Sequence, residues 1–241
     1  MISNLHIFKT PEELANEFAI QLMSWISEHP GMAFHMAISG GKTPDLLLDI
    51  LAKKFPHSYL WQKVHFWWVD ERMVGPTHAE SNFGTANRLL FSQIVIPKEN
   101  IHRIKGENDP EVEAKSYSTQ IQEKLSSQNS LPRFDLLLLG MGDDGHTASI
   151  FPDQLHLMDS QNICEVAVNP QSGQQRITLT GKVINNASVV CFIVTGAGKA
   201  DRMAEIGENQ AKANLLPAAH IHPESGNLHW YLDQAAAKQL S

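Results

Sequence analysis

Apolar and polar positions along the chain follow two different periods, which predict a succession of strands and helices. Short, largely apolar runs bounded by turn residues indicate strands at Met32–Ile38, Val64–Val69, Phe134–Leu139, Arg176–Thr180, Val189–Val194 and Leu228–Leu232. Segments with helical spacing separate these runs. Because continuous apolar strands that alternate with helices are typical of a parallel sheet covered on both faces, we predict an α/β fold with a mostly parallel central sheet.

Helix-start signals support this pattern. At the first helix Thr10 can cap, Pro11 suits the first turn and Glu13 completes a capping box, and the helix then runs to about Glu28. Further helices are predicted from Pro44, over 82–91, from Asp109-Pro110 to about 127, after Gly196–Lys199, and over 233–240. Because no linker rich in Pro, Gly or Ser divides the chain, we predict that residues 1–241 form a single domain.

Composition and charge narrow the class of protein. The formal net charge of −7 argues against a nucleic-acid partner, which needs a basic face. The N-terminus lacks the basic and apolar segments of a signal peptide, and no apolar run approaches the roughly 20 residues needed to cross a bilayer. Cys164 and Cys191 lie in apolar runs and are expected to be buried free thiols. We therefore expect a cytoplasmic protein with no membrane partner.

The loop after the run Met32–Ile38 is rich in backbone donors. Its sequence, Ser39-Gly40-Gly41-Lys42-Thr43-Pro44, has two glycines that allow close approach of a ligand, and Thr43 is expected to cap the following helix. A helix N-terminus of this kind binds anions, although a plain strand-to-helix turn is the alternative. The loop is neither a Walker loop nor a dinucleotide fingerprint, because the required spacing and third glycine are missing.

Two further loops carry basic residues after apolar strands. In Gly196-Ala197-Gly198-Lys199, Lys199 can reach a phosphate, the alternative being a lysine that faces solvent. In Asp70-Glu71-Arg72, Arg72 can bind phosphate or stabilise an oxyanion, the alternative being a surface ion pair. Such loops meet at the carboxyl edge of a parallel sheet, which is where ligands bind.

The stretch Gly140–His146 combines three glycines, two carboxylates and a histidine after a strand. His146 is placed to act as a general base, and Asp144 can hold its ring. A metal site is the competing interpretation, but the chain has no His-Glu-x-x-His pattern, and no metal is expected. The residues alone thus predict an α/β protein that binds a small, phosphorylated ligand and transfers a proton.

At these positions the chain resembles the glucosamine-6-phosphate isomerase/6-phosphogluconolactonase family. The matching segments are Ser39–Pro44, Asp70-Glu71-Arg72 with Ser81-Asn82, Phe134-Asp135 leading into Gly140–Pro152, Arg176–Thr180, Gly196–Ala200, Leu216-Pro217-Ala218 and Gly226–Asp233. They occur in the family's order and span nearly the whole chain, so the set is far more specific than any one motif.

The resemblance implies a three-layer Rossmann-like sandwich and the hydrolysis of 6-phospho-D-glucono-1,5-lactone to 6-phosphogluconate, in the pentose phosphate pathway and without a cofactor. By position, the resemblance implies that His146 is the general base and that Asp144 is its neighbour in the site. The residues implied to bind the phosphate are Ser39, Gly40, Gly41, Thr43, Lys199 and Arg72. Asp70, Lys42 and Arg176 are secondary candidates. Lys42 stands where the family often has a small polar residue, and it either adds a phosphate contact or points to solvent. The expected partner is the small-molecule substrate, and the expected state is a monomer or weak homo-oligomer.

Two alternatives stay open at this point. A glucosamine-6-phosphate deaminase resembles the chain at Asp70-Glu71 and Asp144-Gly145-His146, but that family has Tyr in place of Arg72 and Ile-Ala-Phe-Asn-Glu after the histidine, where this chain has Thr147-Ala148-Ser149-Ile150. A non-catalytic sugar-phosphate binder is the second alternative. If it were the effector domain of a transcription regulator it would need a DNA-binding module, for which the first 36 residues leave no room.

Overall fold

The computed structural model describes residues 2, 4–128 and 130–240. At its centre is a six-stranded sheet with the order β1-β11-β10-β7-β2-β3, in which every pair of neighbours is parallel. Its strands are β1 (Leu5–Phe8), β2 (Phe34–Ile38), β3 (Val64–Trp68), β7 (Leu136–Leu139), β10 (Val190–Val194) and β11 (Leu228–Asp233). The predicted α/β class and parallel central sheet are confirmed.

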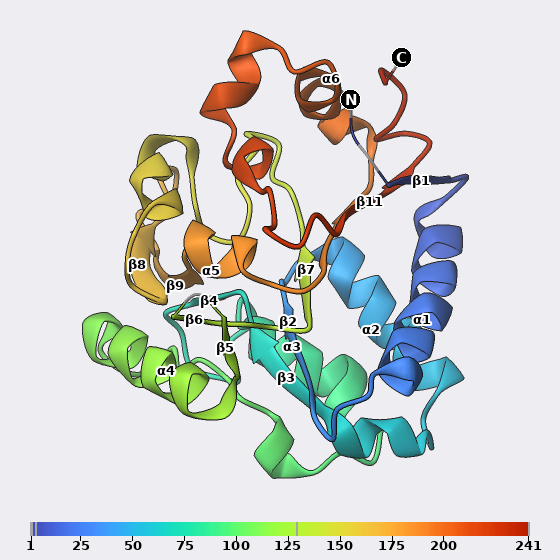
Figure 1. The fold of residues 1–241 in the computed structure, drawn as a ribbon, viewed down its shortest axis with the longest axis vertical. Helices are drawn as coiled ribbons and strands as arrows, with labels where there is room; N and C mark the ends of the chain where they lie inside the picture. The colour runs from blue at the N-terminus through green and yellow to red at the C-terminus, as the bar shows by residue number, and fades with distance from the viewer. Residues whose placement is uncertain (1, 3, 129, 241) are drawn as a thin grey trace.

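Helices cover both faces of this sheet. The α-helices are α1 (Pro11–Glu28), α2 (Lys42–Lys54), α3 (Asn82–Ala86), α4 (Pro110–Lys124), α5 (Gly181–Asn185) and α6 (Ala200–Gly207). In Figure 1, α1 and α2 lie on one side of the sheet, and α4 and α5 lie on the other. β2, β7 and β10 are nearly fully buried between these layers, which is why their sequences are continuously apolar. The arrangement is the expected three-layer sandwich.

Short helical turns complete the chain. They are η1 (Tyr59–Lys63), the π-helical η2 (Asn87–Phe91), η3 (Lys98–Asn100), η4 (Pro152–Met158), η5 (Ala197–Lys199), η6 (Ala211–Leu215) and η7 (Pro217–His220). The predicted helix over 82–91 is thus α3 continued by one wider turn. Among the described residues, no helix has both the length and the apolar character needed to span a membrane.

A second, antiparallel sheet packs beside the first. Its order is β4-β9-β8, with β4 (Asp70–Arg72), β8 (Cys164–Val168) and β9 (Gln175–Leu179). The run Arg176–Thr180 is therefore a strand, as predicted, but it lies outside the parallel sheet. A two-stranded hairpin, β5 (Ser127–Gln128) with β6 (Leu131–Pro132), follows α4. The small sheet brings β9 against β4, directly beyond the end of β3.

The prediction of a C-terminal helix over 233–240 is wrong. Asp233 is the last residue of β11, and residues 234–239 form successive turns. The Asp233 carboxylate accepts hydrogen bonds from the backbone N–H of Gly196 at 3.0 Å and of Ala236 at 2.7 Å. These bonds tie the segment to the end of β10. Ala236 and Ala237 are buried there, so tertiary packing overrides the helix propensity of the alanines.

The start of α1 agrees with its sequence signals. The Thr10 side chain accepts a hydrogen bond from the Glu13 N–H at 3.2 Å, and Glu13 reaches back to the N–H of Lys9 at 2.9 Å. The apolar face of the helix, Leu14, Phe18, Leu22 and Ile26, is fully buried. Capping and amphipathic spacing therefore place this helix where the sequence predicts it.

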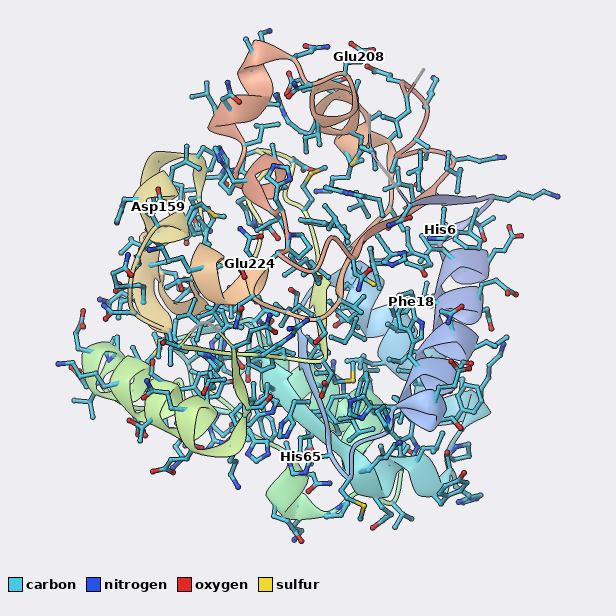
Figure 2. The ribbon with its side chains drawn as sticks, viewed as in Figure 1. His6, Phe18, His65, Asp159, Glu208 and Glu224 are labelled. Carbon is cyan, nitrogen blue, oxygen red and sulfur yellow. The ribbon has the colours of Figure 1, made fainter. Side chains whose placement is uncertain are left out.

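A histidine cluster lies near the amino ends of β2 and β3, away from the edge where the glycine-rich loops emerge; His65 is labelled in Figure 2. His65 Nδ1 and His102 Nε2 are 3.0 Å apart, and the Trp67 indole N–H donates to His35 Nδ1 at 3.2 Å. Burial lowers the pKa of His35 to about 4 and that of His102 to about 3, and charges on Lys124 and neighbouring histidines act in the same direction. The rings are therefore held neutral.

We expect this cluster to make the fold acid-sensitive. The unfolded state, with a histidine pKa near 6.5, binds more protons than the folded state, so stability falls as pH drops from about 6.5 toward the folded pKa values. Each histidine contributes a slope of at most about 1.4 kcal/mol per pH unit. Urea unfolding at pH 7 and pH 5 measures the slope. It should become shallower in His102→Gln but not in His222→Gln, which alters an exposed histidine; equal slopes in both variants would contradict the account.

Candidate active site

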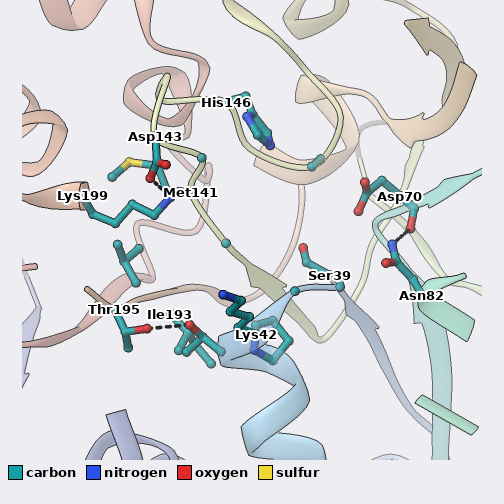
Figure 3. Close-up of a pocket in the computed structure, with 18 of the residues that line it drawn as sticks. Ser39, Lys42, Asp70, Asn82, Met141, Asp143, His146, Ile193, Thr195 and Lys199 are labelled. Atoms are coloured by element: carbon teal, nitrogen blue, oxygen red, sulfur yellow. Dashed lines mark hydrogen bonds and ion pairs between the residues drawn. The ribbon is translucent and has the colours of Figure 1, made fainter. Parts of the chain in front are cut away.

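Four loops converge at the carboxyl edge of the parallel sheet. These segments, here called loops although 70–72 is strand β4, follow β2, β3, β7 and β10 and comprise residues 39–43, 70–72, 140–146 and 195–199. Because the strands are parallel, their carboxyl ends share one edge. The loops enclose a pocket with a volume of about 470 Å³, shown in Figure 3. The strand order thus brings together segments separated by about 150 positions in the sequence.

Most of the residues predicted for the site line this pocket. They are Ser39, Gly40, Gly41, Lys42, Thr43, Asp70, Arg72, His146, Arg176 and Lys199. Asp144 is the exception, because it contacts His146 and does not line the pocket. Lys42 is exposed and also lines the pocket, so its two predicted placements are compatible.

The start of α2 differs in detail from the prediction. The helix begins at Lys42, and its N-cap residue is Gly41, which has a φ of 120° that glycine adopts far more readily than other residues. Thr43 is therefore not the cap, and that prediction is wrong. Its hydroxyl instead forms a 2.7 Å hydrogen bond with the hydroxyl of Thr195, from the loop after β10. Since no side chain caps α2, N–H groups of its first turn are available to an anion.

Gly40 is needed for close packing of this loop against the next one. A Cβ at Gly40 would lie 1.9 Å from Asn82 Oδ1, and the Asn82 amide donates to the Asp70 carbonyl at 2.9 Å. Asn82 lines the pocket and was assigned no role from the sequence. The contact fixes the spacing between the loops that follow β2 and β3.

His146 is paired with Asp144. The distance from His146 Nδ1 to Asp144 Oδ1 is 2.6 Å, and the same oxygen accepts from the His146 backbone N–H at 3.1 Å. Burial of Asp144 favours its neutral form, but the hydrogen bonds and charge of His146 outweigh this and lower the carboxyl pKa. An ionised Asp144 requires Nδ1 to carry a proton, so in the neutral ring the lone pair lies on Nε2. Since the ring lines the pocket, Nε2 is the atom able to accept a proton there.

Two arginines lie opposite each other on the small sheet. Arg72 on β4 pairs in register with Arg176 on β9, and both line the pocket. Their Nε atoms are the two buried side-chain polar atoms that lack a hydrogen-bond partner among residues 2, 4–128 and 130–240. Because a buried donor without a partner is costly, these N–H groups indicate a ligand that supplies acceptors.

Arg176 and His146 both lie against the Phe151 ring. The guanidinium carbon of Arg176 is 5.7 Å from the centre of the Phe151 ring, and that ring is 4.8 Å from the His146 ring. Arg72, in contrast, acts electrostatically on Asp45 in the first turn of α2: burial raises the pKa of this carboxyl, and the charges of Arg88 and Arg72 oppose the rise. The charge of Arg72 therefore also acts at the start of α2.

Four basic side chains, Lys42, Arg72, Arg176 and Lys199, line the pocket against two carboxylates, Asp70 and Asp143. This local excess contrasts with the net charge of −7 for the chain and suits a dianion. Within the part of the chain that the structure describes, no group of three or more His, Cys, Asp or Glu side chains is arranged to hold a metal ion. That the reaction needs no cofactor stays a prediction from the sequence.

Glu71 connects β4 to the start of α3 through hydrogen bonds. Its carboxylate is 1% exposed and accepts 2.8 Å hydrogen bonds from the N–H groups of Arg72, Asn82 and Phe83, with Ser81 Oγ donating at 3.2 Å. Burial raises the pKa of Glu71, and the backbone donors act against the rise. Glu71 thereby fixes Arg72 and the start of α3.

We expect Glu71→Gln to destabilise the protein by about 1 to 3 kcal/mol, because an amide NH₂ would face backbone donors and leave one of them unpaired. Chemical unfolding measures the change in the free energy of unfolding. The same substitution at Glu123, exposed on α4, should stay within about 0.5 kcal/mol of wild type. A Glu71→Gln protein as stable as wild type would show that the carboxylate does not hold the loop.

Three polar pocket residues were not assigned a role from the sequence. Thr195 had a usable signal, since it directly follows an apolar strand at the same sheet edge. Asn82 follows Ser81, the N-cap of α3, but its contact with Gly40 depends on tertiary structure. Asp143 is adjacent to Asp144 in the sequence, yet it forms an ion pair with Lys199. Only the fold distinguishes the tasks of these two aspartates.

Comparisons with known proteins agree with this geometry. The family model of the glucosamine-6-phosphate isomerases/6-phosphogluconolactonase matches residues 9–230. A 6-phosphogluconolactonase from Aggregatibacter actinomycetemcomitans and one from Haemophilus influenzae are each 44% identical over 230 residues, which cover 95% of this chain and 94% of the relative. The crystal structure of the devB protein superposes with a TM-score of 0.92 at 41% identity and covers 99% of both chains. The chain therefore belongs to the glucosamine-6-phosphate isomerase/6-phosphogluconolactonase family.

Proposed function

We propose that this protein is a lactone hydrolase that converts 6-phospho-D-glucono-1,5-lactone to 6-phosphogluconate. One observation carries the proposal: His146, which is paired with Asp144, lines the same pocket as the uncapped start of α2 and the basic side chains. The pocket thus combines a base with an anion site. The relatives at 44% identity carry the name of this activity.

His146 activates the water. Nε2 removes a proton as the water oxygen attacks the lactone carbonyl carbon, and Asp144 stabilises the imidazolium that results. The tetrahedral intermediate carries its negative charge on the former carbonyl oxygen, and the guanidinium group of Arg176, which lines the same pocket as His146, donates a hydrogen bond to that oxygen. When the ring C–O bond breaks, the imidazolium returns the proton to the leaving hydroxyl oxygen. The chemistry therefore needs neither a covalent intermediate nor a redox step.

The phosphate anchors the substrate away from the reacting carbon. The backbone N–H groups of residues 40–43, at the start of α2, donate hydrogen bonds to the phosphate. Positive charge is supplied by Lys199, Arg72 and Lys42. A phosphate carries about −1.5 to −2 charges near neutral pH, so it gains from several cationic partners. Its binding energy positions the lactone against His146.

The test compares two reactions. The lactone is generated in situ by glucose-6-phosphate dehydrogenase, and its disappearance is followed with and without the protein, while a parallel assay measures ammonia release from glucosamine 6-phosphate. We expect faster lactone hydrolysis and no ammonia. Ammonia release without lactone hydrolysis would identify a deaminase, and the absence of both would indicate a non-catalytic binder.

Other features of the protein are proposed on the same basis. Organisation of residues 1–241 as one domain is supported by a core cluster to which both sheets and the flanking helices contribute. The cytoplasmic location, the monomeric or weakly associated state and the lack of a nucleic-acid partner stay predictions from the sequence.

A further inference from the structure

An ion pair joins two of the loops that form the pocket. Lys199, from the loop after β10, donates from Nζ to Oδ1 of Asp143, from the loop after β7, and both residues line the pocket (Figure 3). Lys199 is one of the cations assigned to the phosphate. Its ammonium group is therefore paired with a carboxylate.

The two partners differ in burial. The Lys199 side chain is 21% exposed, whereas that of Asp143 is 80% exposed. A second contact of residue 143 does not involve its carboxylate, because Arg202 Nε donates to the Asp143 backbone carbonyl at 3.3 Å. The carboxylate can consequently rotate into solvent while the lysine remains in the pocket wall.

A phosphate and this carboxylate compete for the same ammonium group. Both are anions, so a phosphate bound at Lys199 would be repelled by an Asp143 carboxylate that stayed in place. An ion pair with one exposed partner is weak, which allows its displacement by a dianion.

We propose that the Asp143 carboxylate competes with the phosphate for Lys199 and so sets the affinity for phosphate-bearing ligands. This inference rests on the proposed function for the identity of the natural ligand. Substrate displaces the carboxylate from Lys199, and the carboxylate returns to Lys199 when product leaves. Asp143 thereby weakens the binding of product and speeds its release.

Binding measurements on Asp143→Asn test this proposal. Isothermal titration with inorganic phosphate and with 6-phosphogluconate should show affinities about 3- to 10-fold tighter than wild type, because Lys199 is freed and a negative charge is removed. Affinity for gluconate, which lacks the phosphate, should not change. Asp201→Asn is the matched control, since it removes an equal charge from an exposed residue near Lys199 that does not line the pocket; it should leave phosphate affinity unchanged.

A second background separates the ion pair from general repulsion. In Lys199→Met, the additional change Asp143→Asn should give less than about a twofold gain, because the competing cation is gone. Unchanged or weaker phosphate binding by Asp143→Asn would overturn the proposal, and so would a full gain in the absence of Lys199. Titration with inorganic phosphate requires no catalysis, so this outcome is independent of whether the protein hydrolyses the lactone.

Discussion

Replacement of His146 by alanine should lower kcat for lactone hydrolysis by about 10² to 10⁴, the usual contribution of a general base. The start of α2 and Lys199, which are assigned to the phosphate, are untouched by the change, so KM should stay within about threefold of wild type. Steady-state rates of lactone disappearance, corrected for spontaneous hydrolysis, give both constants. The expected result is a loss confined to the chemical step.

The matched control is His156→Ala, which removes an exposed histidine on η4 that does not line the pocket. Its kcat should equal that of wild type. If His146→Ala keeps the full rate, another group activates the water and the assignment of the base is wrong, even if the lactone is the substrate.

Gly142→Ala should reduce kcat by about 10²-fold although the histidine itself is not replaced. A Cβ at Gly142 would lie 2.1 Å from His146 Nδ1 and 2.6 Å from Asp144 Oδ1. These distances are far below van der Waals contact, so the pair must separate or the loop must move. Loss of Asp144 as a partner leaves the His146 ring without the hydrogen bond that orients it. A general base displaced by about 1 Å lowers the rate by roughly 10²-fold. Kinetics and a crystal structure of the variant measure the two effects.

Gly140 provides the comparison within the same loop. A Cβ there would meet no atom within 4 Å, so Gly140→Ala should preserve the His146–Asp144 pair and lose much less kcat. Equal losses in the two variants would mean that the loop requires glycine for its backbone and not for the space beside His146.

The fold was largely predictable because its strands are short, apolar and separated by clear helix signals. Thr10 and Pro11 marked the start of α1, and the parallel order placed the loops after β2, β7 and β10 at one edge. The errors are local. Gly41 moved the start of α2 ahead of Thr43, and packing of the alanine-rich C-terminus replaced a helix by turns.

The separate roles of the site residues could be assigned only from the structure. Asp143 and Asp144 are neighbours of the same chemical type, and only the turn of the loop sends one to Lys199 and the other to His146. Arg176 was a secondary candidate until its register with Arg72 placed both guanidinium groups in one pocket. Such contacts join residues far apart in sequence, which local patterns do not report.

A crystal structure of the protein with bound 6-phosphogluconate tests the central claim most directly. We predict the phosphate against the backbone of residues 40–43 and Lys199, and the product carboxylate within about 3.5 Å of His146 Nε2, the reach of a hydrogen bond. A product bound in the reverse direction, with its phosphate at His146 and its carboxylate at the start of α2, would contradict the account.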